Sequence, residues 1–85
     1  MKTIICVSIS IGNNKDVFKK TFDFETKIIP PYIIFMGHKA KVNSEETELD
    51  PENKTITLHC SSEIKFSEQG GAGDIRSAGW EKIKE

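Results

Sequence analysis

The sequence predicts a mainly β or α+β protein: a small twisted antiparallel sheet or barrel of four to five strands, with a short C-terminal helical turn. Two observations carry this prediction. Apolar and polar residues alternate over several stretches, which is typical of half-buried strands. Residues that form turns separate these stretches, at Gly12-Asn13-Asn14, Pro30-Pro31, Gly37 and Asp50-Pro51-Glu52-Asn53.

Composition sets the limits of this prediction. The chain has 85 residues, which is room for a single domain over residues 1–85 with one modest core. Its hydrophobic fraction of 36% and charged fraction of 29% are those of a folded protein. A net charge of -1 argues against a nucleic-acid or membrane-surface binder. No run reaches the roughly 18 apolar residues of a membrane helix, so we expect a soluble, cytoplasmic protein.

The first two strands are the clearest elements. Ile5, Val7, Ile9 and Ile11 share one face, while Cys6, Ser8 and Ser10 share the other. After the Gly12-Asn13-Asn14 turn, a second run alternates to Ile28. The residues on its apolar face are Phe18, Phe22, Phe24, Thr26 and Ile28. Two alternating runs around such a turn predict a β-hairpin.

The segment Tyr32–Met36 is apolar at every position. The prolines before it and Gly37 after it favour a strand over a helix. Tyr32, Ile34 and Met36 would face one side, and Ile33 and Phe35 the other. Either the strand is central and covered on both faces, or Ile33 and Phe35 meet another chain, which makes a homo-oligomer through this strand a second expectation.

The second half of the chain alternates less regularly. Ala40 and Val42 oppose Lys39 and Lys41, and Asn43 to Asn53 is expected to be a long surface connection. A further strand follows from Thr55 to Phe66, with a bend expected at Ser61-Ser62. Its apolar face comprises Ile56, Leu58, Cys60, Ile64 and Phe66.

The C-terminal segment contains the most suggestive motif. Ser67–Gly73 is expected to be a glycine-rich loop, followed by one helical turn over Ile75–Ala78 and a short strand in which Trp80 packs on the core. Backbone N–H groups of such a loop could cradle a phosphate or nucleotide. The ligand-binding residues would be Gly70, Gly71, Gly73, Asp74 and Arg76. The alternative is a flexible connection, since neither the P-loop nor the dinucleotide motif is present.

Five acidic residues crowd into Glu45–Glu52 without a balancing base. They form either a solvated loop that protects a sheet edge or a negative patch that docks on a basic partner. On the second interpretation the partner-binding residues are Ile33, Phe35, Glu45, Glu46 and Glu48.

The sequence contains no recognisable catalytic or metal-binding motif. Cys6, Cys60, His38 and His59 lack the spacing of a zinc site, and neighbouring strand residues point to opposite faces, so His59 and Cys60 should diverge. We expect two reduced, semi-buried thiols, no metal, no cofactor and no enzymatic activity.

The leading functional prediction is therefore a non-enzymatic binding protein, a regulator or inhibitor that acts through protein–protein contact. A small-ligand binder that grips a phosphorylated metabolite or signalling nucleotide through the glycine loop is the alternative. A structural component of a larger assembly is a third. The order of elements resembles small proteins of unknown function from bacteria and their phages, which implies a bacterial or phage origin but carries over no functional residue.

Overall fold

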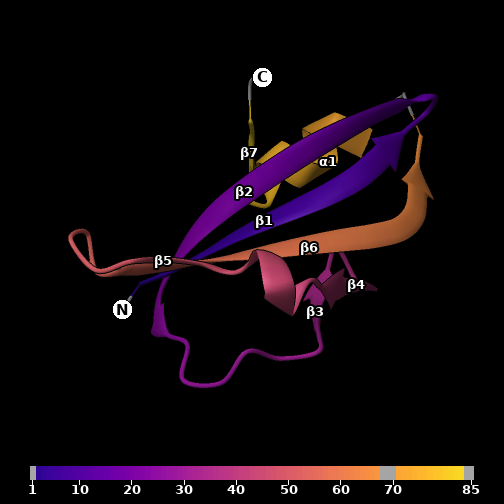
Figure 1. Ribbon diagram of the computed structural model, residues 1–85. Coiled ribbons are helices and arrows are strands. Elements are labelled where there is room, and N and C mark those ends of the chain that lie inside the picture. Colours follow the sequence, from indigo (N-terminus) through magenta and orange to yellow (C-terminus); the bar gives the residue numbers. More distant parts are fainter. Residues whose placement is uncertain (1, 68–70, 84–85) are drawn as a thin grey trace.

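The computed structural model describes residues 2–67 and 71–83 of the chain. Seven strands form one sheet, in the order β3-β4-β6-β1-β2-β7, with β5 paired to β6. This is an open mixed sheet, larger than the four or five antiparallel strands expected from the sequence. The elements are β1 (Lys2–Ile11), β2 (Asn14–Glu25), β3 (Tyr32–Phe35), β4 (His38–Val42), the 3-10 helix η1 (Ser44–Glu46), β5 (Glu48–Asp50), β6 (Thr55–Phe66), α1 (Gly71–Ser77) and β7 (Glu81–Lys82) (Figure 1).

The predicted β1–β2 hairpin is confirmed. The two strands are antiparallel, with Val7 opposite Phe18 and Ile11 opposite Asn14. Gly12 forms the turn with a φ of 57°, a value that glycine adopts without steric cost. β2 ends at Glu25, earlier than the alternation suggested, and Ile28 is 83% exposed.

A parallel pair lies at the centre of the sheet. β1 runs parallel to β6, with Ile5 beside Leu58 and Val7 beside Cys60. The prediction of a wholly antiparallel sheet was wrong, because alternation shows which residues share a face but not the direction of the neighbouring strand. The expected irregularity in β6 is present: the register shifts after Ser61, and the strand bends near its end (Figure 1).

The acidic connection is more ordered than predicted. β4 and β5 both run antiparallel to β6, with Val42 opposite Cys60 and Glu48 opposite Thr57. They therefore form one strand that η1 interrupts, and the surface turn is confined to the residues between Asp50 and Thr55. The amide of Asn43 donates to the carbonyl of His59 at 2.8 Å, which holds the interrupted strand to β6 just before η1.

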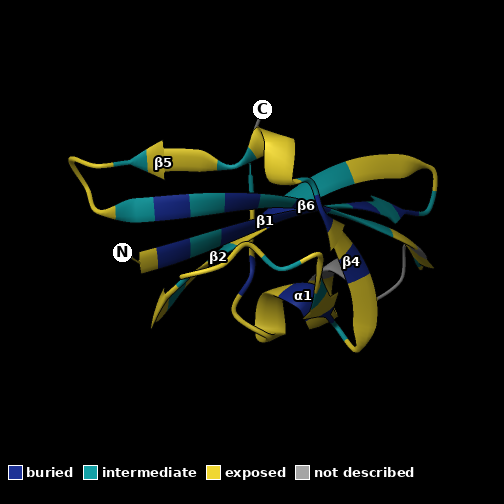
Figure 2. Ribbon diagram, turned by 60° about the horizontal axis from the view of Figure 1, so that its bottom comes forward, coloured by how far each residue is buried: buried dark blue, intermediate teal, exposed yellow. Residues whose placement is uncertain are grey.

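One face of the sheet carries the core and the other is open. Alternate residues of β1 and β6 are buried, which Figure 2 shows as alternating bands along both strands. Helix α1 and the chain around Trp80 cover the buried face, and Ile75 is fully buried there. The core consists of Ile5, Val7, Ile9, Ile11, Phe18, Phe35, Ala40, Val42, Ile56, Leu58, Cys60, Ile75 and Trp80.

Helix α1 ends in a Schellman motif. The amide of Gly79 donates to the carbonyl of Arg76 at 2.9 Å, and the amide of Trp80 donates to the carbonyl of Ile75 at 3.3 Å. These are the two bonds of the motif, and the accompanying apolar contact is supplied by Ile75 and Trp80. The motif directs the indole into the core, where its ring lies 4.8 Å from that of Phe35 between centroids.

Candidate functional site

The glycine-rich segment is a helix where the structure describes it, instead of the predicted loop. Gly71, Gly73, Asp74 and Arg76 lie within α1, while Gly70 lies outside the described residues. Asp74 and Arg76 are exposed, and the hydroxyl of Ser77 donates to the carbonyl of Gly73 at 2.9 Å. The helix anchors Ile75 in the core. Anion binding by these residues stays a prediction.

The apolar strand β3 lies at the end of the sheet order, so it is an edge strand and not the central strand considered above. Phe35 is fully buried, and Ile33 packs partly buried against the core. Phe35 therefore belongs to the core of this chain, and a contact of Ile33 and Phe35 with another chain stays a prediction. Tyr32 and Ile34 project from the opposite face, and they are 47% and 61% exposed.

The hydrogen-bond pattern shows which groups of β3 point outward. Antiparallel pairs alternate between bonded and non-bonded positions. Because the amide of Val42 donates to the carbonyl of Pro31 at 3.1 Å, the next bonded position along the pair is Ile33 opposite Ala40. The backbone groups of Tyr32 and Ile34 therefore face away from β4. No other described residue hydrogen-bonds to them.

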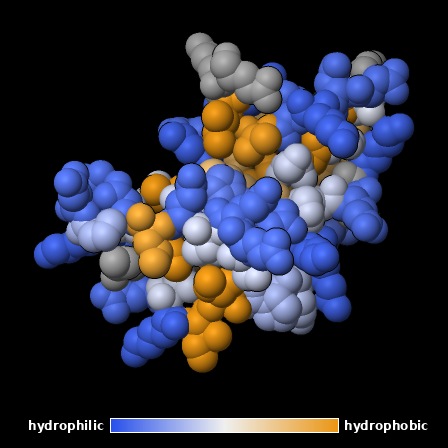
Figure 3. Space-filling model, in the orientation of Figure 1, coloured by the Kyte–Doolittle hydropathy of each residue, from blue (hydrophilic) through white to orange (hydrophobic). Residues whose placement is uncertain are grey.

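The exposed large apolar side chains concentrate near this edge. Ile28, Ile29, Tyr32 and Ile34 all lie within seven sequence positions of one another, and each is at least 38% exposed. Figure 3 shows apolar surface at the bottom of the view, where Figure 1 draws the chain that joins β2 to β3. We call Ile28, Ile29 and the outward groups of Tyr32 and Ile34 the β3 edge.

A hollow of about 420 Å³ lies beside the β3 edge on the open face. The ammonium of Lys39 lies 4.7 Å from the centroid of the Tyr32 ring, and Lys41 is directly opposite Tyr32 in the strand pairing. Neither ammonium has a carboxylate partner in the described part of the chain. The hollow is lined by Pro31, Tyr32, His38, Lys39, Lys41, Ser61 and Glu63.

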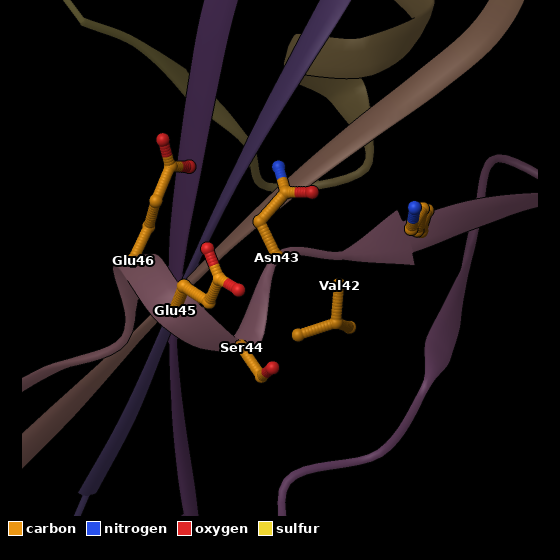
Figure 4. Close-up of a pocket in the computed structure, with 6 residues that line it drawn as sticks. Val42, Asn43, Ser44, Glu45 and Glu46 are labelled. Atoms are coloured by element: carbon orange, nitrogen blue, oxygen red, sulfur yellow. The ribbon is translucent and has the colours of Figure 1, made fainter.

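The acidic residues predicted to bind a partner are split between two elements. Glu45 and Glu46 lie in η1, and Glu48 lies in β5, where its Oε2 is 3.0 Å from Nε2 of His59. A second hollow, of about 440 Å³, is formed by Lys41–Glu46. Figure 4 shows Asn43 and Glu46 projecting to the same side of this segment and Ser44 to the other. The structure does not bring these carboxylates together with Ile33 or Phe35.

The strand pairing also produces a neighbour that the sequence did not reveal. Cys6 lies opposite His59 on the open face, while Cys60 faces the core, so His59 and Cys60 diverge as expected. Burial raises the pKa of Cys6, as it raises that of Cys60 to about 11. A catalytic cysteine has a lowered pKa, and no hydrogen bond joins Cys6 to His59 in the described residues. The pair therefore lacks the features of a nucleophile and its base.

No group of three or more His, Cys, Asp or Glu side chains in residues 2–67 and 71–83 is arranged to hold a metal ion. Over the same residues, no helix combines the length and apolarity needed to cross a membrane.

Neither a protein-family model, nor a curated protein sequence, nor a solved structure matches this chain.

Proposed function

We propose that this chain is a non-enzymatic protein-binding module, a regulator or inhibitor, that holds an extended segment of its partner as an additional strand on β3. The observation that supports this function is the pair of outward-facing residues Tyr32 and Ile34, whose backbone groups are unpaired among the described residues. Strand addition at a sheet edge gives affinity through main-chain hydrogen bonds and specificity through alternate side chains.

The other edge strands support the choice of β3. Natural sheets protect their edges with charged side chains, irregularities or very short strands. β5 carries Glu48 and Asp50 and adjoins η1, and β7 has only two residues, both charged. β3 carries no charged residue, and its two outward side chains are large and apolar. An unprotected apolar edge in a small domain is a surface suited to a partner.

Proline substitutions test this function. Ile34→Pro removes an outward N–H and leaves the β3–β4 ladder intact, because proline is tolerated where the amide faces away from the sheet. We expect random linear peptides selected on the immobilised protein to lose most of their affinity for Ile34→Pro. Ile34→Ala keeps the amide and should retain part of the binding.

Folding controls accompany this experiment. Ile33→Pro removes an amide that points toward β4, so it should cost about 3 kcal/mol or more of the free energy of unfolding. Ile34→Pro should keep the near-UV circular dichroism of the unmodified protein. Selection of no peptide, or peptides that bind Ile34→Pro as tightly as the unmodified protein, would contradict strand addition at β3.

A further inference from the structure

The surroundings of the β3 edge constrain the chemistry of the segment that would pair with it. A strand added to β3 places alternate side chains on the open face, next to Tyr32 and Ile34. Lys39 and Lys41 lie on the same face, one strand further into the sheet. The Lys39 ammonium lies 4.7 Å from the centroid of the Tyr32 ring, so this side chain reaches a side chain of β3 itself.

Two lysines at this corner of the molecule have no ion pair within residues 2–67 and 71–83. Lys39 and Lys41 are both exposed and have no carboxylate partner among the described residues. Both line the hollow that also contains Glu63, and Lys41 borders the second hollow with Glu45 and Glu46. Two other lysines of the described residues do have carboxylate partners: Lys2 lies 3.6 Å from Asp23, and Lys82 lies 3.2 Å from Asp16. Two unpaired cations beside an apolar edge complement an anionic side chain on the partner.

We infer that the partner segment is an extended strand with carboxylate side chains on the face that it shares with Tyr32 and Ile34, and that Lys39 and Lys41 recognise them. The inference rests on the proposed strand addition at β3 and adds the charge of the occupant. Apolar side chains of the segment would face Ile33 on the other side of the sheet. Lys39 and Lys41 are binding residues in this arrangement, and the hollow beside them receives the carboxylates.

The peptides selected on the immobilised protein give the first test. They should be enriched in Asp or Glu at alternate positions. The peptide that binds most tightly is then synthesised in three forms. The first keeps its acidic residues, the second has Gln in their place, and the third has Lys in their place. Fluorescence polarisation measures the affinity of each peptide.

Charge exchange gives the second test. Each exposed ion pair contributes up to about 1 kcal/mol, which is roughly a fivefold change in affinity. Lys39→Gln and Lys41→Gln should each weaken the acidic peptide three- to fivefold and leave the Gln peptide unchanged. The double variant Lys39→Glu, Lys41→Glu should reject the acidic peptide and bind the Lys peptide. The matched control, Lys15→Gln with Lys19→Gln, alters lysines paired with Ser10 and Cys6 on the same face, away from β3.

The outcomes separate the inference from the proposed function. Peptides that require the Ile34 amide but bind equally well in acidic and Gln forms would overturn the inference and leave strand addition in place. Peptides that ignore Ile34→Pro would overturn both. Light scattering of the protein alone tests whether a second copy of the chain occupies the β3 edge. A dimer that Ile34→Pro converts to a monomer would show that it does, and would contradict the inference of an acidic partner segment.

Discussion

At the scale of single residues, Gly79 has the most constrained backbone of helix α1 and its exit. Its φ is +96°, a region that L side chains rarely adopt. A Cβ at this position would lie 3.2 Å from the end of the Lys20 side chain, whose ammonium donates to the carbonyl of Ala78 at 2.8 Å. Gly79 thus serves the turn into Trp80 and leaves room for a lysine at the negative end of the helix.

The substitution Gly79→Ala should lower the free energy of unfolding by about 1–2 kcal/mol, because alanine is strained at a positive φ and crowds Lys20. Gly73→Ala is the matched control: a Cβ there meets nothing within 4 Å, and the position is helical. That control should raise stability by roughly 0.5–1 kcal/mol. Urea titration followed by Trp80 fluorescence measures both, and equal effects would contradict the role of Gly79.

The two cysteines carry the second residue-scale property. Both are free, buried thiols, and burial raises the pKa of each. Burial, together with a smaller contribution from the nearby Cys6, raises the pKa of Cys60 from 9.0 to about 11. Burial disfavours the charged thiolate, so the two thiols hold their protons more tightly in the folded protein than in the unfolded chain.

Stability should therefore be constant with respect to these thiols below pH 9 and fall as the pH rises from 9 through 11. The sign follows from linkage: a folded-state pKa above the unfolded value gives stability that is lost on deprotonation. Two pKa units set an upper scale of roughly 2–3 kcal/mol for Cys60. Equilibrium unfolding at a series of pH values tests this. Cys60→Ala should flatten the pH dependence, and an unchanged slope in that variant would contradict the assignment.

At the scale of elements, alternation predicted the long strands but not the short ones. The β1–β2 hairpin followed from alternating β-branched and aromatic residues around a turn. β5 and β7, with three and two residues, are too short to show a period, and their neighbours in space decide their conformation. Helix α1 starts in a glycine-rich stretch of poor helix propensity, and the burial of Ile75 and Trp80 overrides that preference.

The candidate site shows the same division. The sequence indicated that Tyr32–Met36 holds too much apolar surface for one face, and the structure agrees for Tyr32 and Ile34. It could not show which face of the strand the core covers, because that depends on contacts of Phe35 with Trp80 and Phe66, residues distant in sequence. For the same reason Lys39 and Lys41 were identified as strand residues but not as neighbours of the β3 edge.

At the scale of the whole molecule, the core depends on the C-terminal segment. The Trp80 ring contacts those of Phe35 in β3, at one end of the sheet order, and Phe22 in β2, next to the strand at the other end. Ile75 is fully buried in the same cluster. Residues beyond Ser67 therefore close a core whose other members belong to the sheet.

A chain that ends at Ser67 should lose cooperative unfolding, because removing Ile75 and Trp80 exposes the apolar face of the sheet. Each large core residue contributes on the order of 3–5 kcal/mol, which approaches the whole stability of a small domain. Urea titration by far-UV circular dichroism tests this. The control Arg76→Ala changes an exposed side chain of α1 and should shift stability by less than about 0.5 kcal/mol. A sharp two-state transition in the truncated chain would contradict the dependence.

The parallel pairing of β1 with β6 has a consequence for the order in which the ribosome delivers the chain. β1 and β2 are synthesised before β6, whose first residue is Thr55. At roughly 5–20 residues per second, β6 is completed a few seconds after β2. During that interval Ile5, Val7, Ile9 and Phe18 of the hairpin lack the neighbours that bury them in the finished sheet. The strand that organises the folded protein therefore waits longest for its central partner while the chain is being made.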